Sequence, residues 1–234
     1  LGAMRVSEEI DWILSDQLLA HHALDGDIAG VHAGQRVNAT LEGGLPNFVP
    51  GRLGAAASFD GQRFIDAGRS PNLDYVDEFS LSAWLYPTTE TGVIVSRASG
   101  GDQGEGGWGL YLEDGKVRLS LSTRVLDDGV AAETVDNVVL NEWQHVLATY
   151  DGSKTPGGMR VYLNGWSQEL TPLLDLVGNR LPQRYPLRIG ASGSTKPRFE
   201  GHIDDVRIYD VVLTAERAAV VATGDAVSEI AAIA

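Results

Sequence analysis

The sequence contains no cysteine, which excludes both a disulfide framework and a thiolate metal site. It also has no secretory apolar region at its start and no apolar run near ~18 residues, the length that spans a bilayer as a helix. Positive charge is scarce, since 18 Lys and Arg stand against 32 Asp and Glu, giving a formal net charge of -14. Because nucleic-acid binders neutralise phosphates with Lys and Arg, this balance argues against nucleic acid and against an anionic membrane surface.

What is present suits a sandwich of short strands. The 234 residues, 43% of them hydrophobic, can bury a large core, and 28 glycines fit many turns. Residues 79–86 alternate apolar and mostly polar side chains, the period of two typical of a sheet. Asp114-Gly115, Asp151-Gly152 and Asn164-Gly165 predict tight hairpin turns, since these residues tolerate positive φ. Strands are predicted at residues 18–24, 55–60, 79–86, 92–97, 108–112, 116–123, 143–150, 159–164, 187–190 and 199–209.

Helical patterns are confined to the two ends, at residues 7–14, 214–223 and 226–233. We therefore expect an N-terminal helical extension over residues 1–15, one β domain over 16–223, and a helical tail or linker to a following domain over 224–234. The opening Leu1-Gly2-Ala3-Met4 does not look like a native start. It indicates non-native residues ahead of a piece excised from a longer protein.

Seven phrases recur in a characteristic order along the chain. They begin with Phe59-Asp60-Gly61 and continue at residues 79–85, 143–146, 148–152, 161–165, 187–190 and 201–209. In this order they resemble the laminin-G-like domains of the concanavalin A-like lectin and glucanase superfamily. The resemblance implies an all-β, antiparallel two-sheet jelly-roll sandwich with short terminal helices, in which Trp84 and Trp143 pack inside. That family consists mostly of binding modules.

A narrower resemblance involves residues 19–27, which are similar to a sub-branch found inside large extracytoplasmic bacterial proteins that also carry cytochrome-type domains. It implies a secreted or periplasmic location as an accessory domain of a larger protein. No haem motif lies in this chain, because Cys-x-x-Cys-His needs cysteine.

The residue patterns that carry catalysis are missing. Retaining glycoside hydrolysis needs two carboxyl groups about 5–5.5 Å apart, and the Glu-x-Asp-x-(x)-Glu run of jelly-roll glucanases is absent. The nearest acidic groups, at residues 74–78 and 127–128, are interpreted as solvated turn acids. The adjacent His21 and His22 point to opposite faces of a strand, so they cannot jointly bind one metal. We predict no catalytic residue and no enzyme activity.

Metal binding depends on the resemblance. An EF-hand at residues 25–36 is rejected, because a ligand position holds Ala and the final Glu is replaced by Arg. The family resemblance implies instead one structural Ca²⁺ held by Asp204 of the closing strand, with partners near Asp25 and the Asp60-Gly61 turn. The alternative is that Asp204 pairs with a nearby Arg or caps a turn.

Ligand-binding candidates come from loops and aromatic side chains. Sugar rings stack on exposed aromatics, and small-molecule sites add a few placed polar groups. The candidates are Asp102, Glu105, Trp108, Asp128 and Trp166. For the two tryptophans the alternative is packing in the core or at an edge, and for the loop at residues 100–108 it is a mobile solvent loop.

Together these observations favour a non-catalytic recognition module that binds a glycan or a protein, within a larger secreted or periplasmic bacterial protein. The first alternative is a structural spacer or docking domain that contacts only neighbouring domains. The second is a jelly-roll glycoside hydrolase, which the missing carboxylate run disfavours. Function rests at this point on likeness of fold.

Overall fold

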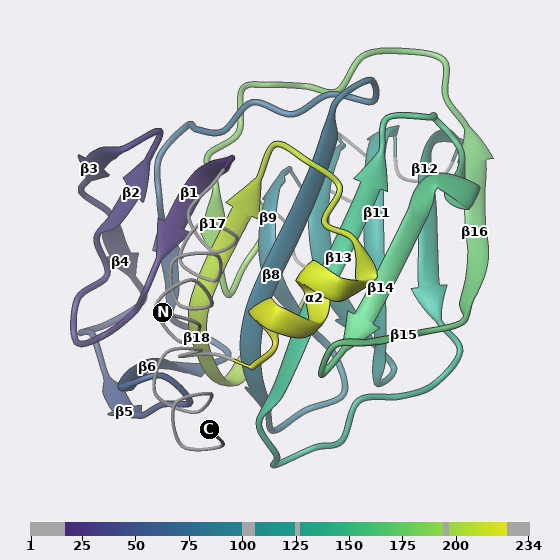
Figure 1. The fold of residues 1–234 in the computed structure, drawn as a ribbon. Coiled ribbons are helices and arrows are strands. Elements are labelled where there is room, and N and C mark those ends of the chain that lie inside the picture. Colours follow the sequence, from purple (N-terminus) through teal and green to yellow (C-terminus); the bar gives the residue numbers. More distant parts are fainter. Residues whose placement is uncertain (1–16, 100–105, 125–126, 194–196, 224–234) are drawn as a thin grey trace, which may run out of the picture.

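The computed structural model describes residues 17–99, 106–124, 127–193 and 197–223, which form two stacked antiparallel sheets (Figure 1). The first sheet runs in the order β15-β14-β13-β8-β18-β1-β2-β3, and the β5–β6 hairpin joins it because β6 pairs with β18. Its strands are β1 (Leu18–His22), β2 (Gly30–His32), β3 (Gln35–Val37), β5 (Phe48–Pro50), β6 (Ala55–Asp60), β8 (Glu78–Pro87), β13 (Gln144–Asp151), β14 (Met159–Leu163), β15 (Trp166–Ser167) and β18 (Glu200–Tyr209).

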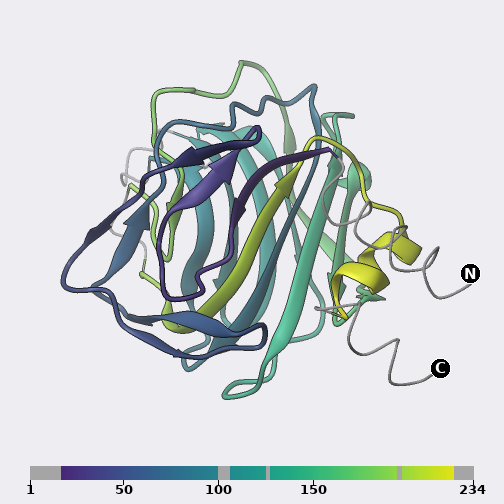
Figure 2. The ribbon, with the colours of Figure 1, turned by 60° about the vertical axis from the view of Figure 1, so that its left-hand side comes forward.

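The second sheet runs in the order β16-β12-β11-β10-β9-β17-β7-β4. Its strands are β4 (Thr40–Glu42), β7 (Phe64–Asp66), β9 (Gly92–Ala98), β10 (Gly107–Glu113), β11 (Lys116–Arg124), β12 (Asp128–Thr134), β16 (Leu170–Leu176) and β17 (Arg188–Ile189). A 3-10 turn, η1 (Pro156–Gly158), precedes β14. Helix α2 (Ala215–Val221) packs outside the sandwich, against the outer face of the first sheet (Figure 2).

The predicted all-β, antiparallel two-sheet fold is confirmed. Strand β6 has the predicted bounds, and most of the other predicted strands differ by one residue at either end. Asp114 and Gly115 adopt φ values of 52° and 80°, and Asn164 and Gly165 adopt 51° and 81°. Two consecutive residues with positive φ match the twist of the flanking strands, which is why these sequences form tight hairpins. The tight turn predicted at Asp151-Gly152 is wrong, because residues 152–158 form a longer connection that contains η1.

Eight strands of the described structure escaped the sequence prediction. They are the short strands β2, β3, β4, β5, β7 and β15, the interior strand β12 and the edge strand β16. β16, an edge strand of seven residues, contains Pro172, and most of its side chains are exposed. An edge strand tolerates proline and shows little apolar alternation, so the pattern of a strand is hidden. The predicted helix at 214–223 corresponds to α2, which is capped by the Thr214 hydroxyl accepting from the Arg217 amide at 3.4 Å. The predicted helices at 7–14 and 226–233 lie outside the described residues.

The main core lies between the sheets. On β8 the side chains of Phe79, Leu81, Ala83 and Leu85 point inward and are fully buried, as their alternation predicts. Burying each large apolar side chain contributes roughly 1.5–3 kcal/mol. A second apolar cluster lies under α2 and consists of Leu147, Tyr162, Tyr209, Leu213, Ala218 and Val221.

The two tryptophans expected inside the sandwich lie on its outer face. Trp84 is buried, but its ring meets the His145 ring at 5.2 Å and lies under the Arg52 guanidinium at 4.9 Å. Trp143 is only half-buried and contacts Tyr86, with ring centroids 5.7 Å apart. The expectation that both side chains face the inside of the sandwich was wrong, because positions 84 and 143 alternate out of phase with the core side chains of β8 and β13.

The two adjacent histidines of β1 point to opposite faces, as the alternation of a strand requires. His22 is buried, and its Nε2 lies 3.0 Å from Nε2 of His32. His21 is half-buried, and its Nε2 lies 2.7 Å from Oδ1 of Asp205. Burial, together with the neighbouring His32, lowers the pKa of His22 to about 4, so this pair is neutral at pH 7.

Candidate functional site

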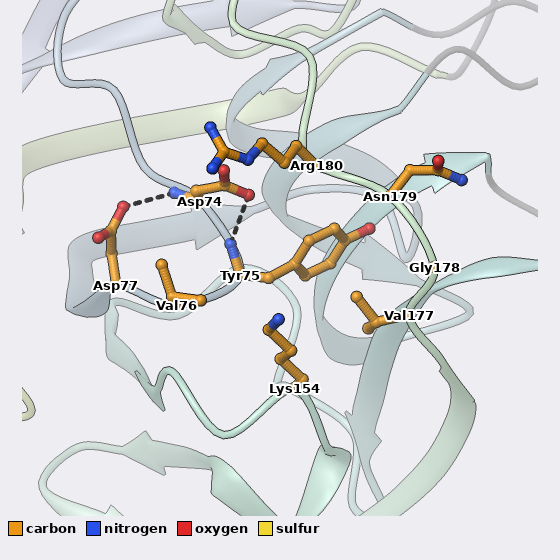
Figure 3. A pocket seen from close by; sticks show the side chains of 9 residues that line it. All are labelled: Asp74, Tyr75, Val76, Asp77, Lys154, Val177, Gly178, Asn179 and Arg180. Carbon is orange, nitrogen blue, oxygen red and sulfur yellow. Dashed lines mark hydrogen bonds between the residues drawn. The ribbon is translucent and has the colours of Figure 1, made fainter.

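A cavity of about 640 Å³ opens at the end of the sandwich where β16 finishes and β8 and β12 begin (Figure 3). Three segments form it: the turn before β8, the loop between β13 and η1, and the strap that follows β16. Its lining residues are Asp74, Tyr75, Val76, Asp77, Lys154, Val177, Gly178, Asn179 and Arg180. The volume falls within the range of small-ligand sites.

Tyr75 lines the cavity with a buried side chain. Its hydroxyl donates to the Asp128 carbonyl at 3.3 Å, and its own carbonyl accepts from the Tyr150 hydroxyl at 2.8 Å. The Tyr150 hydroxyl in turn accepts from the Lys154 amide at 2.8 Å. Burial raises the pKa of Tyr75 to about 12, so its hydroxyl remains a donor at neutral pH.

Two carboxylates lie in the turn before β8. Oδ1 of Asp74 accepts from the amides of Tyr75 at 2.8 Å and Leu181 at 3.1 Å, and Oδ2 of Asp77 accepts from the Asp74 amide at 2.7 Å. Figure 3 shows two of these bonds as dashed lines. Each carboxylate uses one oxygen to fix the turn. Among the described residues, no donor reaches the second oxygen of either group, so both keep a free acceptor beside the cavity.

Two cations line the same cavity. Lys154 comes from the loop before η1, and Arg180 comes from the strap after β16. In Figure 3 they lie on either side of the Tyr75 ring. Within the part of the chain that the structure describes, neither charged group has an ion-pair or hydrogen-bond partner. The cavity therefore presents both donors and acceptors to a ligand.

Asp128 is a structural anchor of the cavity wall. It is 2% exposed, and its carboxylate accepts from the Gly178 amide at 2.7 Å and the Asn179 side chain at 2.5 Å. Burial opposes ionisation, but these hydrogen bonds outweigh it and hold the pKa of Asp128 below its usual range. The interpretation of Asp128 as a solvated turn acid, and its prediction as a direct ligand contact, are both wrong. It holds the strap that carries Asn179 and Arg180.

Arg97 holds the neighbouring loops to the sheet. Its side chain is 1% exposed and donates to the carbonyls of Pro71 at 2.8 Å, Gln183 at 2.6 Å and Tyr185 at 2.7 Å. It also donates to the side chains of Asn72 and Gln183. One buried guanidinium from β9 thus joins the loop before the 74–77 turn to the loop after the strap.

The other predicted ligand residues do not gather at this cavity. Trp108 is 1% exposed and packs in the core beside Phe79, so its prediction as a ligand contact is wrong, because β10 turns that side chain inward. Trp166 is 78% exposed on β15, at the edge of the first sheet. Asp102 and Glu105 lie outside the described residues. No ligand role was predicted from the sequence for Asp74, Asp77, Lys154 or Arg180. The one local signal for them is the Asp-x-x-Asp pattern at residues 74–77 ahead of a strand, and it is weak.

Asp204 and Asp25, two of the predicted metal ligands, lie at the same turn. Oδ2 of Asp204 accepts from the amides of Arg52 at 2.9 Å and Leu53 at 2.8 Å, and Oδ1 of Asp25 accepts from the Ala55 amide at 2.6 Å. Asp204 is 0% exposed, and its Oδ1 has no partner among the described residues. Burial, with neighbouring Asp charges adding to it, raises the pKa of Asp204 to about 7.

The other two predicted metal ligands lie elsewhere. Asp60 pairs in register with Glu200, four positions before Asp204 on β18, which is about 13 Å at ~3.3 Å per residue. Its Oδ1 caps its own turn by accepting from the amides of Gln62 and Arg63. Gly61, with φ of 77°, continues that turn. Within the described ranges no three His, Cys, Asp or Glu side chains gather as a metal site, and the predicted four-residue set is wrong as a single cluster. The orphaned Oδ1 of Asp204 is the atom that still suits a hard cation.

An antiparallel jelly-roll sandwich with a polar cavity at its loop end places this protein in the class of lectin-like β-sandwich domains. The chain belongs to the laminin-G-like family of the concanavalin A-like lectin/glucanases superfamily, whose profile matches residues 59–219. The predicted family is therefore confirmed.

The relatives of this chain are distant. The adhesion G-protein coupled receptor V1 of Danio rerio is 27% identical over an alignment of 180 residues that covers 71% of this chain and 3% of that protein. The chain thus spans a small part of this curated relative. The likeness shows a domain that is shared with a much longer protein.

Two solved structures have a similar fold. One is domain 4 of AbnA, a GH43 extracellular arabinanase from Geobacillus stearothermophilus, in complex with arabinotriose, with TM-score 0.57, 19% identity, and coverage of 88% of this chain and 98% of that one. The other is the binding domain of Paraclostridial Mosquitocidal Protein 1, with TM-score 0.67, 17% identity, and coverage of 89% and 52%. At these identities the likeness is one of fold. The described residues include no helix long and apolar enough to cross a membrane.

Proposed function

We propose that this chain is a non-catalytic recognition module that binds a glycan in the cavity at its loop end. The observation that carries the proposal is the cavity lining, in which polar side chains from three segments surround one space of about 640 Å³. Sugars present several hydroxyl groups as donors and acceptors, which free carboxylate oxygens and cationic donors can bind. Domain 4 of AbnA, described in complex with arabinotriose, supports the proposal as a domain of similar fold.

The roles of the carboxylates support binding without catalysis. Asp74 and Asp77 each give one oxygen to backbone amides that hold the loop together. A glycosidase needs a proton donor and a second carboxylate placed on either side of the scissile bond. The run of acidic residues that supplies these groups in jelly-roll glucanases is absent from the sequence.

A glycan array followed by isothermal titration calorimetry tests this function. Asp77→Asn should weaken binding of the best glycan about tenfold, because it weakens an acceptor within the cavity. Glu78→Gln is the matched control, since Glu78 is an exposed neighbour that does not line the cavity. A glycan whose affinity responds equally to both substitutions, or an array without binding, would overturn the proposal. Hydrolysis of a bound glycan would overturn its non-catalytic part.

A second candidate function, a docking domain for neighbouring domains, is favoured by one observation. Trp166 is 78% exposed on the edge strand β15, and Leu173 and Leu176 on β16 are also exposed. Exposed apolar side chains near open sheet edges are typical of contact surfaces. This function would be favoured if the module lost solubility when neighbouring domains are removed and also bound no glycan on the array.

The setting of the module is part of the proposal. We propose that it belongs to a longer extracytoplasmic bacterial protein, as the resemblance of residues 19–27 implies. The small share of the matched receptor that this chain covers, 3%, agrees with a domain used inside longer chains. The full sequence of the parent protein and its location after cell fractionation test this point.

We also propose one structural Ca²⁺ at Asp204. Its support is the buried, unpartnered Oδ1 beside the turn that Asp25 holds. Because Asp204 and Asp25 are the two predicted ligands that lie there in the described structure, backbone carbonyls and water would complete the oxygen shell that Ca²⁺ requires.

A further inference from the structure

Two residues that line the cavity, Lys154 and Arg180, are positively charged although the chain as a whole is strongly acidic. The formal net charge is -14, and many cations of the described fold have carboxylate partners. Arg118 pairs with Glu133 at 2.7 Å, and Arg207 pairs with Asp205 at 3.0 Å. By contrast, Lys154 and Arg180 line one cavity with no partner among the residues that the structure describes. Both residues are exposed, so water solvates their charges in the free protein, and together they give one site on an acidic protein where an anionic ligand group meets positive charge.

The carboxylates of the same cavity do not pair with these two cations. Asp74 and Asp77 each bind backbone amides with one oxygen, and neither lies within ion-pair distance of Lys154 or Arg180 in the described structure. The charged lining is nevertheless balanced, with two carboxylates and two cations. A polyanion such as a heavily sulfated chain would meet repulsion from the two carboxylates. A ligand with a single negative group and several hydroxyls would not.

We propose that the cavity recognises a sugar that carries a carboxylate, such as a uronic or sialic acid unit. Arg180 supplies the planar pair of donors that suits a carboxylate, and Lys154 supplies the second cation. The free oxygens of Asp74 and Asp77 accept from ring hydroxyls. This inference rests on the proposed glycan-binding function and names the class of glycan. The cavity volume of about 640 Å³ accommodates one or two sugar units.

The test compares each acid with its own neutral derivative. Galacturonic acid and sialyllactose, each with a single carboxylate, are titrated beside their methyl esters, which keep the ring hydroxyls and lose the negative charge. We expect one of the acids to bind about tenfold more tightly than its ester, with a preference that shrinks as NaCl rises from about 50 to about 300 mM. Whichever acid shows the preference identifies the source of the carboxylate. A heparin hexasaccharide, as a polyanion, should bind more weakly than that acid.

Variants assign the preference to the cavity. Arg180→Ala and Lys154→Asn should each reduce the acid-over-ester preference at least threefold, and asparagine suits position 154 because the backbone there has φ of 62°. Arg36→Ala is the matched control, an exposed arginine paired with Asp27 outside the cavity lining. It removes the same charge and should leave the preference intact.

The outcomes separate this inference from the function on which it rests. If an acid and its ester bind equally at the cavity, or if only neutral glycans bind there, the carboxylate inference is wrong and glycan binding stands. If heparin binds more tightly, or if Arg36→Ala lowers the preference as much as Arg180→Ala, the inference is also wrong. If no glycan binds, both proposals fall.

Discussion

The Tyr150 hydroxyl donates a hydrogen bond to the Tyr75 carbonyl over 2.8 Å and thereby ties the end of β13 to the turn that carries Asp74 and Asp77. It also accepts from the Lys154 amide at 2.8 Å. Burial raises the pKa of Tyr150 to about 12, so this donor keeps its proton. One phenol therefore connects two of the three segments that form the cavity.

Replacing Tyr150 by Phe removes both hydrogen bonds and leaves the Tyr75 carbonyl without its donor. We expect the free energy of unfolding, measured by urea denaturation, to fall by about 1–3 kcal/mol. Tyr162→Phe is the matched control, because its ring packs under α2 and its hydroxyl has no hydrogen bond within the described ranges. Equal effects of the two substitutions would contradict a role for the Tyr150 hydroxyl.

Asp128→Ala should lower the free energy of unfolding by about 1.5–3 kcal/mol and weaken glycan binding, because the strap at Gly178 and Asn179 loses its anchor. Since the pKa of Asp128 is lowered in the fold, its stabilisation is present above the ordinary pKa and is lost as pH falls through the folded value. Asp127→Ala, which removes an exposed pair with Arg124, should change stability by less than ~1 kcal/mol. Urea denaturation from neutral to acidic pH measures both, and a stable Asp128→Ala would refute the anchor.

Asp204 makes stability fall as pH rises. Its folded pKa is about 7 and its unfolded pKa is 3.8, so the folded chain retains a proton that the unfolded chain loses between these values. The contribution of Asp204 is therefore full below about pH 4, declines up to about pH 7 and is constant above it. The total change is on the order of 4 kcal/mol. Asp204→Asn should remove this slope from the free energy of unfolding measured against pH, and an unchanged profile would show that Asp204 is not its source.

Calcium at Asp204 would change that profile, because a cation favours the ionised carboxylate. We expect Ca²⁺ at about 100 times its Kd to raise stability by about 2.7 kcal/mol and to flatten the pH dependence. Asp60→Asn should leave the response to calcium intact, whereas Asp204→Asn should abolish it. If EDTA leaves the melting temperature unchanged in protein purified without chelator, the calcium proposal is wrong, and a proton remains the partner of Asp204.

The two tryptophans predicted as ligand contacts should respond in opposite ways. Trp166→Ser should change the free energy of unfolding by no more than about 0.5 kcal/mol, because the side chain is 78% exposed. Trp108→Ala should cost about 3–5 kcal/mol, because it empties part of the core. Thermal and urea unfolding measure both. A large loss of stability in Trp166→Ser would contradict its exposed position and weaken the case for a docking surface.

Long, alternating strands were predictable from the sequence. β6, β8 and β18 place apolar side chains on one face, and the Asp114-Gly115 and Asn164-Gly165 turns need two residues that tolerate positive φ. The edge strand β16 was missed, because pairing on one side alone demands little apolar alternation, and the interior strand β12 was missed although it is paired on both sides. Tertiary pairing, rather than local pattern, decides such strands.

The cavity was beyond prediction for a different reason. Asp77 and Arg180 lie about a hundred positions apart, with Lys154 between them, and the order of strands in the two sheets brings all three to one cavity. Asp128 could not be distinguished from its exposed neighbour Asp127, because burial is set by the strap that folds over it. Trp108 illustrates the converse, since an aromatic residue after a glycine-rich loop has the same local sequence whether it faces solvent or core.

The buried Arg97 guanidinium, which joins two loops, affects which sequence changes those loops can accept. Three of its acceptors are backbone carbonyls, those of Pro71, Gln183 and Tyr185, which every amino acid provides. The side chains of these loops can therefore be substituted while the backbone of the loops keeps its path. This one buried arginine thus separates the paths of the loops from the identity of their side chains, and the loop surface can change while the scaffold that presents it stays.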